Sequence, residues 1–496
     1  MEAHSPSGVA AAAHIHPDDT VAVALRALAR GEKVLGVTLR QDIPAGHKFA
    51  IKDNVAGEEV IKFALPIGRA LSPIKKGEWV HTHNVGSQLD GIHSYAYQPR
   101  TAPRTAIPLD RRTFMGFLRE DGRAGIRNEL WILPTVACVN GLAARLAREI
   151  GGQVPGGAAA FTHPYGCSQT GADLDRTRDM LIRMACHPNA GGVLVLGLGC
   201  ENNLLCGFQA ALGNRGGARV KYLNTQSVGN ETQAGLSLLS ELASVMAGDM
   251  RVPLPLDKLV VGLKCGGSDG YSGITANPLL GAFTDRLLAS GGSAVLTEVP
   301  EMFGAETVLL NRANNKETYR KVLHMINHYK RYLKRQGQSL DGNPSPGNKE
   351  GGLTTLEEKS LGCVQKSGSG PIVDALPYAD TVSRKGLSLL YGPGNDLCAV
   401  TALAAAGCQM ILFTTGRGTP LGSPVPVVKV SASTELARQK PHWTDFDAGT
   451  LITGERMPQA AQRLAEYCLN VADGAQTCSE INGYRDFALL KDGVTL

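Results

Sequence analysis

The stretch LVVGLKCGGSDGYSGITANP, residues 259–278, decides how the chain is interpreted. It begins as a short apolar run, turns through two glycines, and then presents several polar side chains within ten residues. Open α/β sheets bind ligands beyond the carboxyl ends of their strands, where such loops lie. We therefore expect this stretch to form the floor of a binding site, with Ser268, Asp269 and Asn277 as contact residues.

The same alternation of apolar runs, glycine turns and helical segments fills the chain from residue 113 onward. It indicates βαβ units and an α/β fold with largely parallel sheets. A Pro-Leu-Pro sequence at residues 253–255 divides it into a second α/β domain at 113–255 and a C-terminal α/β domain at 256–496. We expect Asn140 to cap a helix, Glu201 to lie in a first helical turn, residues 315–335 to form one long helix, and residues 341–352 to form an irregular loop.

The N-terminal part has a different pattern of apolar and turn residues. After a flexible tail at residues 1–13, Asp18, Asp19 and Thr20 could cap a helix whose apolar face is Val21, Ala24, Leu25 and Leu28. Short β-like runs separated by turn residues follow, so residues 14–90 are expected to be a small α+β or β-rich domain. Residues 91–112 are expected to be a linker, because they contain three prolines and have no helical or strand period.

Composition narrows the class of protein. A chain of 496 residues is expected to form two to four domains. Its net charge of +5 is small and dispersed, so nucleic acid is not an expected partner. The eleven cysteines fit a reducing cytoplasm, and neither a signal peptide nor a membrane span is expected.

Histidines and cysteines suggest two alternative metal sites. His81 and His83 alternate and can share one face of a strand, so with His16 and His47 they are candidate metal ligands, while His14 is taken as a spectator. The alternative is that all are ordinary surface histidines. Four cysteines lie where apolar runs end or glycine turns begin, and they could be metal ligands, a nucleophile or core residues. They are Cys138, Cys167, Cys200 and Cys265.

Other candidates are single residues or weak motifs. GLGCENN at residues 197–203 lacks the third glycine of a dinucleotide fingerprint, so no nucleotide cofactor is expected. Arg417, between two glycines, could grip a carboxylate or simply pair with an acidic neighbour. Asn348 and Lys349 offer an amide and a cation, and Glu298 and Glu301 are candidate acids or bases that could equally be solvated.

Several long motifs occur in one order over residues 14–496, and together they resemble the altronate/galactarate dehydratase family: GHKFAIKDNVAG, VHTHN, GRAGIRNELWILPTVACVNG, YGCSQ, HPNAGGVLVLGLGCENN, CGGSDGYSGITANP, LTEVPEMFGAE, NPSPGNKEGG, TTGRGTP and KDGVTL. The resemblance implies an N-terminal β-clip domain of the SAF type followed by two α/β domains. It further implies dehydration of a sugar acid, D-altronate to 2-dehydro-3-deoxy-D-gluconate, with Fe²⁺ or Mn²⁺ as the expected metal. A homo-oligomer is possible.

On this interpretation the metal ligands are His16, His47, His81 and His83, in part or whole. The contenders for the catalytic base are His47, Lys48 and Glu298. The substrate-binding residues are Ser268, Asp269, Asn277, Asn348, Lys349 and Arg417. Cys265 is then favoured as a packing residue.

Three rival functions stay open at this point. One is a lyase of the same architecture that acts on galactarate, another 2-hydroxy acid or a sulfonated analogue. The second is an iron–sulfur dehydratase that uses Cys167, Cys200 and Cys265, and the third is a sugar-acid binding protein without catalytic activity.

Overall fold

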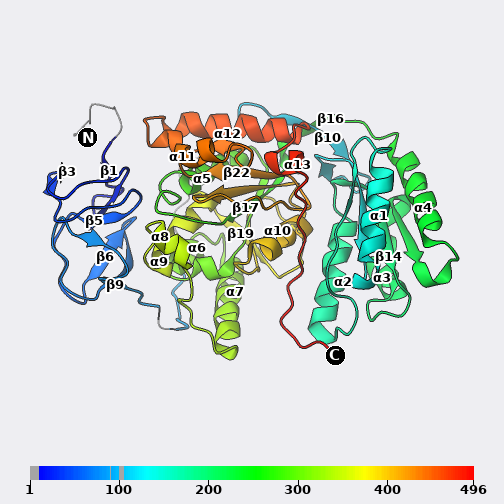
Figure 1. The fold of residues 1–496 in the computed structure, drawn as a ribbon, viewed down its shortest axis with the longest axis horizontal. Coiled ribbons are helices and arrows are strands. Elements are labelled where there is room, and N and C mark those ends of the chain that lie inside the picture. Colours follow the sequence, from blue (N-terminus) through cyan, green and yellow to red (C-terminus); the bar gives the residue numbers. More distant parts are fainter. Residues whose placement is uncertain (1–9, 90, 100–105) are drawn as a thin grey trace.

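The computed structural model describes residues 10–89, 91–99 and 106–496, which form three bodies in a row (Figure 1). The N-terminal domain lies at one end, the C-terminal α/β domain in the middle and the second α/β domain at the other end. Most of the predicted tail and part of the predicted linker fall outside the described residues. An α/β fold is confirmed.

The N-terminal domain is built from short strands, and residues 10–89 contain no helix. One sheet has the antiparallel order β1-β2-β5-β8 and a second has the order β6-β7-β9, beside a small β3-β4 hairpin. The strands are β1 (Ala12–Ala13), β2 (Val21–Ala24), β3 (Lys33–Val34), β4 (Val37–Thr38), β5 (Lys48–Ala50), β6 (Glu59–Lys62), β7 (Leu65–Ala70), β8 (Trp79–Val80) and β9 (Val85–Gly86).

The prediction of a helix after Asp18-Asp19-Thr20 is wrong. Residues 21–24 form strand β2 instead, with all four side chains buried. A continuous apolar run suits a strand buried on both faces better than it suits a helix with one apolar side. Asp19 does not cap a helix; its carboxylate accepts hydrogen bonds from the backbone N–H groups of His16 and Ala64.

The second α/β domain has a parallel sheet of order β13-β12-β14-β15. Helices α1 and α4 contribute to the apolar core on one side of it, and α2 and α3 contribute to another core. The elements are β12 (Glu129–Pro134), η1 (Ala137–Val139), α1 (Asn140–Gly151), β13 (Ala158–Ala160), α2 (Gly171–Ala185), β14 (Ala190–Gly197), α3 (Leu205–Leu212), η2 (Gly213–Arg219), β15 (Val220–Asn224), η3 (Thr225–Ser227) and α4 (Glu231–Met246).

Two local predictions in this domain are wrong. Asn140 is the first residue of α1 rather than its cap, and its side-chain amide donates to the carbonyl of His163. Glu201 precedes α3 by four residues and lies in a loop. Its carboxylate accepts hydrogen bonds from the backbone N–H groups of Leu198 and Gly199, so it stabilises the turn instead of the helix.

A small sheet of order β11-β10-β16 connects this domain to the next, with β10 (Thr113–Leu118), β11 (Ala124–Gly125) and β16 (Val252–Pro255). The proline-containing boundary at residues 253–255 is therefore part of a strand. It pairs antiparallel with β10. The two α/β domains are tied together at this point by backbone pairing as well as by chain connection.

The C-terminal domain contains a seven-stranded parallel sheet of order β19-β20-β18-β17-β21-β22-β23. Its strands are β17 (Val260–Cys265), β18 (Ser293–Leu296), β19 (Ile372–Leu376), β20 (Leu387–Leu390), β21 (Met410–Thr415), β22 (Val427–Ser431) and β23 (Phe446–Asp447). Its helices are η4 (Leu256–Lys258), α5 (Ala276–Ala289), η5 (Val299–Met302), α6 (Glu306–Leu310), α7 (Lys316–Arg335), α8 (Pro346–Glu350), α9 (Leu356–Cys363), η6 (Val364–Ser367), α10 (Asp396–Ala405), α11 (Thr434–Gln439), η7 (Gly449–Leu451), α12 (Met457–Ala472) and α13 (Cys478–Ile481).

The long helix predicted at residues 315–335 is confirmed as α7, which Asn315 caps by accepting from the N–H of Thr318. The loop predicted at residues 341–352 is only partly irregular, because it contains the short helix α8. Ser345 and Asn348 form a capping box that starts this helix after a proline-rich approach.

The N-terminal domain packs directly on the polar loops of the C-terminal domain. Lys48 Nζ donates to the carbonyl of Gly352 at 2.7 Å, and Thr355 Oγ1 donates to the carbonyl of Ile67. A Cβ atom at Gly270 would lie 1.9 Å from the carbonyl oxygen of Gly46, so the two backbones approach too closely for any other residue there.

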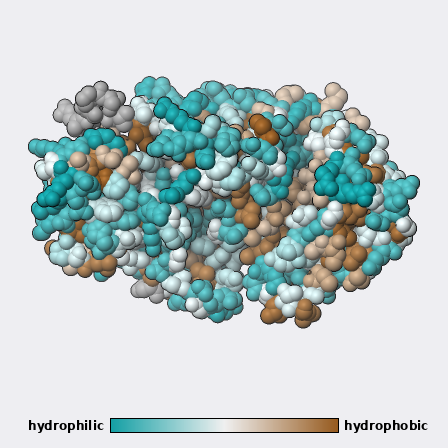
Figure 2. Space-filling view, in the orientation of Figure 1, coloured by the Kyte–Doolittle hydropathy of each residue, from teal (hydrophilic) through white to brown (hydrophobic). Residues whose placement is uncertain are grey.

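The C-terminal tail crosses from the central domain to the second domain and ends there (Figure 1). The N–H of Gly493 donates to Asp173 at 2.7 Å, and the N–H of Leu496 donates to the carbonyl of Ser168 at 3.0 Å. Figure 2 shows a mostly hydrophilic face, with apolar side chains gathered near the border of these two domains. Of the helices in the described residues, none has the length and apolar character needed to cross a membrane.

Candidate active site

The polar loop that follows β17 lies at the carboxyl edge of the seven-stranded sheet, as its sequence predicted. Asp269 is buried, and its carboxylate accepts hydrogen bonds from the N–H groups of Tyr271 and Ser272 and from the Ser272 hydroxyl. Burial raises the pKa of Asp269 although these donors oppose the shift. Asn277, in the first turn of α5, accepts a hydrogen bond of 2.6 Å from the hydroxyl of Thr414.

Helix α8 brings further predicted residues to this loop. The side-chain amide of Asn348 donates to the carbonyl of Ser268 at 2.8 Å. Arg417 is exposed; its guanidinium donates to the carbonyl of Gly347 at 3.2 Å and lies 3.6 Å from the carboxylate of Glu350. Lys349 lies in the same helix, half-buried. The structure therefore brings five of the six predicted substrate-binding residues together, on the loop after β17, α5, α8 and the end of β21, and the sixth, Lys349, lies on α8 beside Asn348.

The N-terminal domain adds two buried lysines that share one carboxylate. Glu358 Oε2 lies 2.9 Å from Lys48 Nζ, and Glu358 Oε1 lies 2.8 Å from Lys62 Nζ. Burial lowers the pKa of Lys48 to about 8, against the opposing effect of Glu358. Although burial opposes ionisation of Glu358, the two lysines lower its pKa to about 2. Lys48 therefore titrates closer to neutral pH than an ordinary lysine does.

Two of the four predicted histidine ligands lie together beside Lys48. The rings of His47 and His81 are 5.0 Å apart, and His81 stacks on Trp79 at 5.3 Å. Burial, with smaller effects of Lys48 and His47, lowers the pKa of His81 to about 4, so its ring is neutral at physiological pH. His81 Nδ1 is buried and has no hydrogen-bond partner among the described residues.

The remaining histidines are placed differently. His47 uses both ring nitrogens, since Nδ1 accepts from the indole N–H of Trp79 at 3.2 Å and Nε2 lies 3.1 Å from the carbonyl of Glu350. His83 is exposed, with its ring 5.3 Å from that of Trp79. His16 is exposed, and its Nδ1 accepts from the N–H of Asp18.

The histidines do not form a ready ligand set for the implied metal. Three potential ligand atoms lie within 4.8 Å of one another at one place in the described residues, and that group is Cys265, Glu301 and Cys363. The donors of His16, His47, His81 and His83 do not meet this condition in the conformation described. Metal binding by the four histidines stays a prediction that this geometry does not support.

The third contender for the base, Glu298, belongs to a buried charge network. It has a left-handed backbone, with φ of 72°, at the turn after β18. Its carboxylate is ion-paired with Lys264 and lies 3.5 Å from Lys366 Nζ. Burial and the neighbouring Glu301 raise the pKa of Glu298, while Lys264 opposes the shift.

A small cavity of about 10 Å³ lies among these groups. That volume holds about one water molecule, so a sugar acid does not fit without movement. The cavity has Ser268, Asp269 and Asn277 on one side and Lys62 and Phe63 of the N-terminal domain on another. Phe63 also lines a separate cavity of about 820 Å³ and so stands between the two.

Sequence reasoning named Glu298 and Glu301 but missed most of the other buried charges, which are Lys62, Lys264, Glu358, Lys359 and Lys366, and it also missed Cys363. One usable signal was present. The segment LEEKSLGC, residues 356–363, has three consecutive charged residues in a short run that also contains Leu356 and Leu361, and the structure shows that every residue of this helix is buried. Charged side chains are rarely buried unless they are paired, so such a helix marks a functional or ion-paired region.

Buried polar and charged residues at the carboxyl edge of a parallel sheet are the usual arrangement of an enzyme site in an α/β protein, and comparison with known proteins gives the family. Three family descriptions match in order: the altronate/galactarate dehydratase SAF domain at residues 10–88, the D-galactarate dehydratase/altronate hydrolase second domain at 116–247, and the D-galactarate/altronate dehydratase C-terminal domain at 256–495. The chain belongs to the altronate/galactarate dehydratase family and is a hydro-lyase.

Individual relatives match over nearly the whole chain. Altronate dehydratases of Bacillus subtilis and Escherichia coli are each 49% identical, over 97% of this chain and 99% of the relative. The galactarate dehydratase (L-threo-forming) of Escherichia coli is 32% identical, over 93% of this chain and 92% of the relative. The predicted family and the predicted SAF-type domain are confirmed.

Proposed function

We propose that this protein removes water from D-altronate to give 2-dehydro-3-deoxy-D-gluconate. The observation that carries the proposal is the 49% identity to two altronate dehydratases over almost full length, against 32% to a galactarate dehydratase. The arrangement of the site supports it, because cations, amides and hydroxyls suited to a polyhydroxy acid meet at one sheet edge. Galactarate or another 2-hydroxy acid is the alternative substrate.

Lys48 is our choice for the base that abstracts the C2 proton. A base works best when its pKa lies near the working pH, and burial brings the pKa of Lys48 to about 8. Its neutral amine can take a proton, and the ammonium that forms is stabilised at once by Glu358 at 2.9 Å. Glu298 is a weaker choice because Lys264 and Lys366 hold its carboxylate.

The remaining residues bind and orient the acid. Arg417 is exposed and offers a planar pair of donors for the substrate carboxylate, which suits bidentate recognition. Lys349 adds a second cation from α8. Ser268, Asn277 and Asn348 supply hydroxyl and amide groups for the substrate hydroxyls, and the short hydrogen bonds between their loops hold them in place.

We further propose dependence on a divalent metal, Fe²⁺ or Mn²⁺. A bound ion would stabilise negative charge that develops on the substrate carboxylate and on the departing oxygen. The four predicted histidines do not form a ligand set for such an ion in the conformation described.

The test is release of a 2-keto acid from altronate and from galactarate by the purified protein, with Fe²⁺, with Mn²⁺ and after treatment with a chelator. We expect a higher kcat/KM for altronate and loss of turnover after chelation. A higher kcat/KM for galactarate would select the alternative substrate. Binding of either acid without product under all three conditions would indicate a binding protein and refute the proposal.

A further inference from the structure

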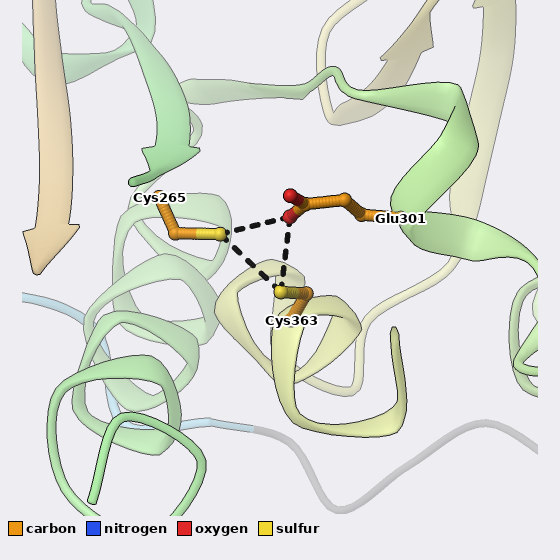
Figure 3. A group of neighbouring side chains, drawn as sticks. All are labelled: Cys265, Glu301 and Cys363. Carbon is orange, nitrogen blue, oxygen red and sulfur yellow. Dashed lines mark hydrogen bonds between the residues drawn. The ribbon is translucent and has the colours of Figure 1, made fainter. Parts of the chain in front are cut away.

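The side chains of Cys265, Glu301 and Cys363 point toward one another in the C-terminal domain (Figure 3). Glu301 Oε2 lies 3.0 Å from Cys265 Sγ and 3.1 Å from Cys363 Sγ, and the two sulfurs are 3.3 Å apart. All three residues are at most 5% exposed. We propose that this group, the thiol centre, binds a thiophilic divalent cation such as Fe²⁺ or Zn²⁺.

The distances suit an ion after a small expansion. In a tetrahedral site with metal–sulfur bonds of about 2.3 Å and metal–oxygen bonds of about 2.1 Å, two sulfurs are about 3.8 Å apart and a sulfur and an oxygen about 3.6 Å apart. The observed separations are shorter by about half an ångström, which side-chain rotations can supply. Three protein ligands leave a fourth position open, as in metal sites that act on substrates.

The three ligands come from elements that fix their positions. Cys265 ends β17, and Glu301 lies in η5, after the neighbouring strand β18. Cys363 ends α9, one helical turn after Lys359. Lys359 Nζ holds the other oxygen of Glu301 at 2.9 Å, so Oε2 is directed toward the sulfurs. Such an outer partner is what orients a carboxylate ligand in metal sites.

The charges around the thiol centre also favour a cation. Lys264 is neutralised by Glu298 and Asp396, with Asp396 at 2.8 Å. Lys359 pairs with Glu301, and Lys366 lies 3.5 Å from Glu298. Deprotonation of the two thiols, which metal binding requires, would therefore leave an excess of buried negative charge. A divalent ion removes that excess.

The thiol centre borders the substrate-binding loops. Cys363 and Lys359 line the 10 Å³ cavity that Ser268, Asp269 and Asn277 also line. An ion on that side of the ligands would face the polar loop of residues 266–275. The inference deepens the proposed metal dependence and rests on it for any catalytic role, but binding of the ion is measurable without substrate. Soft thiolates select iron or zinc over manganese.

The test uses the full chain, stripped of metal under reducing conditions and titrated with Co²⁺. We expect one tightly bound equivalent and a sulfur-to-cobalt charge-transfer absorption in the near ultraviolet. Cys265→Ala and Cys363→Ala should each abolish the absorption and weaken binding by more than the roughly 10–100-fold that loss of an outer-shell partner costs. Cys408→Ala, which also removes a buried thiol, is the matched control and should bind normally.

Three results would overturn the inference. The first is that Co²⁺ binds without giving the sulfur absorption, and that this binding survives in both cysteine variants but is lost in His81→Ala. The second is no binding by the wild-type protein, and the third is a Cys265–Cys363 disulfide in freshly reduced and repurified protein. The wild-type spectrum decides the matter even if a variant fails to fold. Turnover of altronate is scored separately, so a thiol-bound ion without turnover would reject the proposed function alone.

Discussion

Replacement of Glu358 by glutamine tests the assignment of Lys48 as the base. Dehydration that depends on neutral Lys48 should rise as the pH rises through its pKa, about 8, and level off above it. Glu358 raises that pKa, since it favours the ammonium form. In Glu358→Gln the attraction is lost, the pKa of Lys48 falls, and the acidic limb of kcat/KM moves to lower pH.

The geometry sets the size of the effect. Two opposite charges 2.9 Å apart attract by about 6 kcal/mol at an effective dielectric constant of about 20. Lys62, which pairs with the same carboxylate, and solvent relaxation reduce the net change. We expect the limb to move by at least about one pH unit, which corresponds to about 1.4 kcal/mol. Breaking a buried pair also costs about 3–5 kcal/mol of stability, so the amount of folded enzyme will fall.

The assay is the pH profile of kcat/KM for 2-keto acid release, because the position of the limb does not depend on the fraction of enzyme that is folded. Lys62→Met is the matched control of opposite sign. Lys62 lowers the pKa of Lys48, so its removal should move the limb to higher pH. Limbs that stay in place, or that move in the same direction in both variants, would refute the assignment.

Three further predictions concern other parts of the molecule. Arg417→Met should raise KM for the acid about 10-fold or more with little change in kcat, as expected for loss of a charge-assisted pair of hydrogen bonds, while the exposed Arg148→Met should leave steady-state kinetics unaltered; an unchanged KM removes Arg417 from the site. Ala64 has a left-handed backbone, with φ of 60°, so Ala64→Gly should raise the free energy of unfolding by up to about 1 kcal/mol in a denaturant titration. The control Ala56→Gly should lower it, and a lower value in both variants would mean that the turn at Ala64 is not strained. A thiol reagent added to the native protein should react fastest with the four exposed cysteines, Cys138, Cys167, Cys200 and Cys206, as read by peptide mass mapping. A fast reaction of Cys265 or Cys363 would contradict their burial.

Local patterns predicted the fold well where the signal lies within one element. The strand, glycine turn and helix alternation gave both parallel sheets, and α7 begins one residue after its predicted start, at its Asn315 cap. The prediction failed at β2, where four buried residues in a row carry no period that separates strand from helix. There the pairing with β1 and β5, which is not local, decides the conformation.

The same difference between local and non-local contacts separates the site residues that the sequence predicted from those that it did not. Ser268, Asp269 and Asn277 were found because one strand and the loop that follows it place them together in sequence. Cys363 was missed because it meets Cys265 only after folding, 98 positions further along the chain. Glu358 and most lysines of the buried network were missed because charged residues are ordinarily exposed, and only their pairing across elements makes burial tolerable.

Helix α9 connects several of these buried charges to the thiol centre. Its Glu358 receives Lys48 and Lys62 from the N-terminal domain, the next residue, Lys359, holds Glu301, and its last residue is Cys363. A buried ion pair is a weak source of stability, so stability alone does not account for charges that apolar residues could replace. The arrangement instead ties the position of the thiol centre to docking of the N-terminal domain. A relative that lost this docking would be expected to lose the alignment of Cys363 with Cys265 as well.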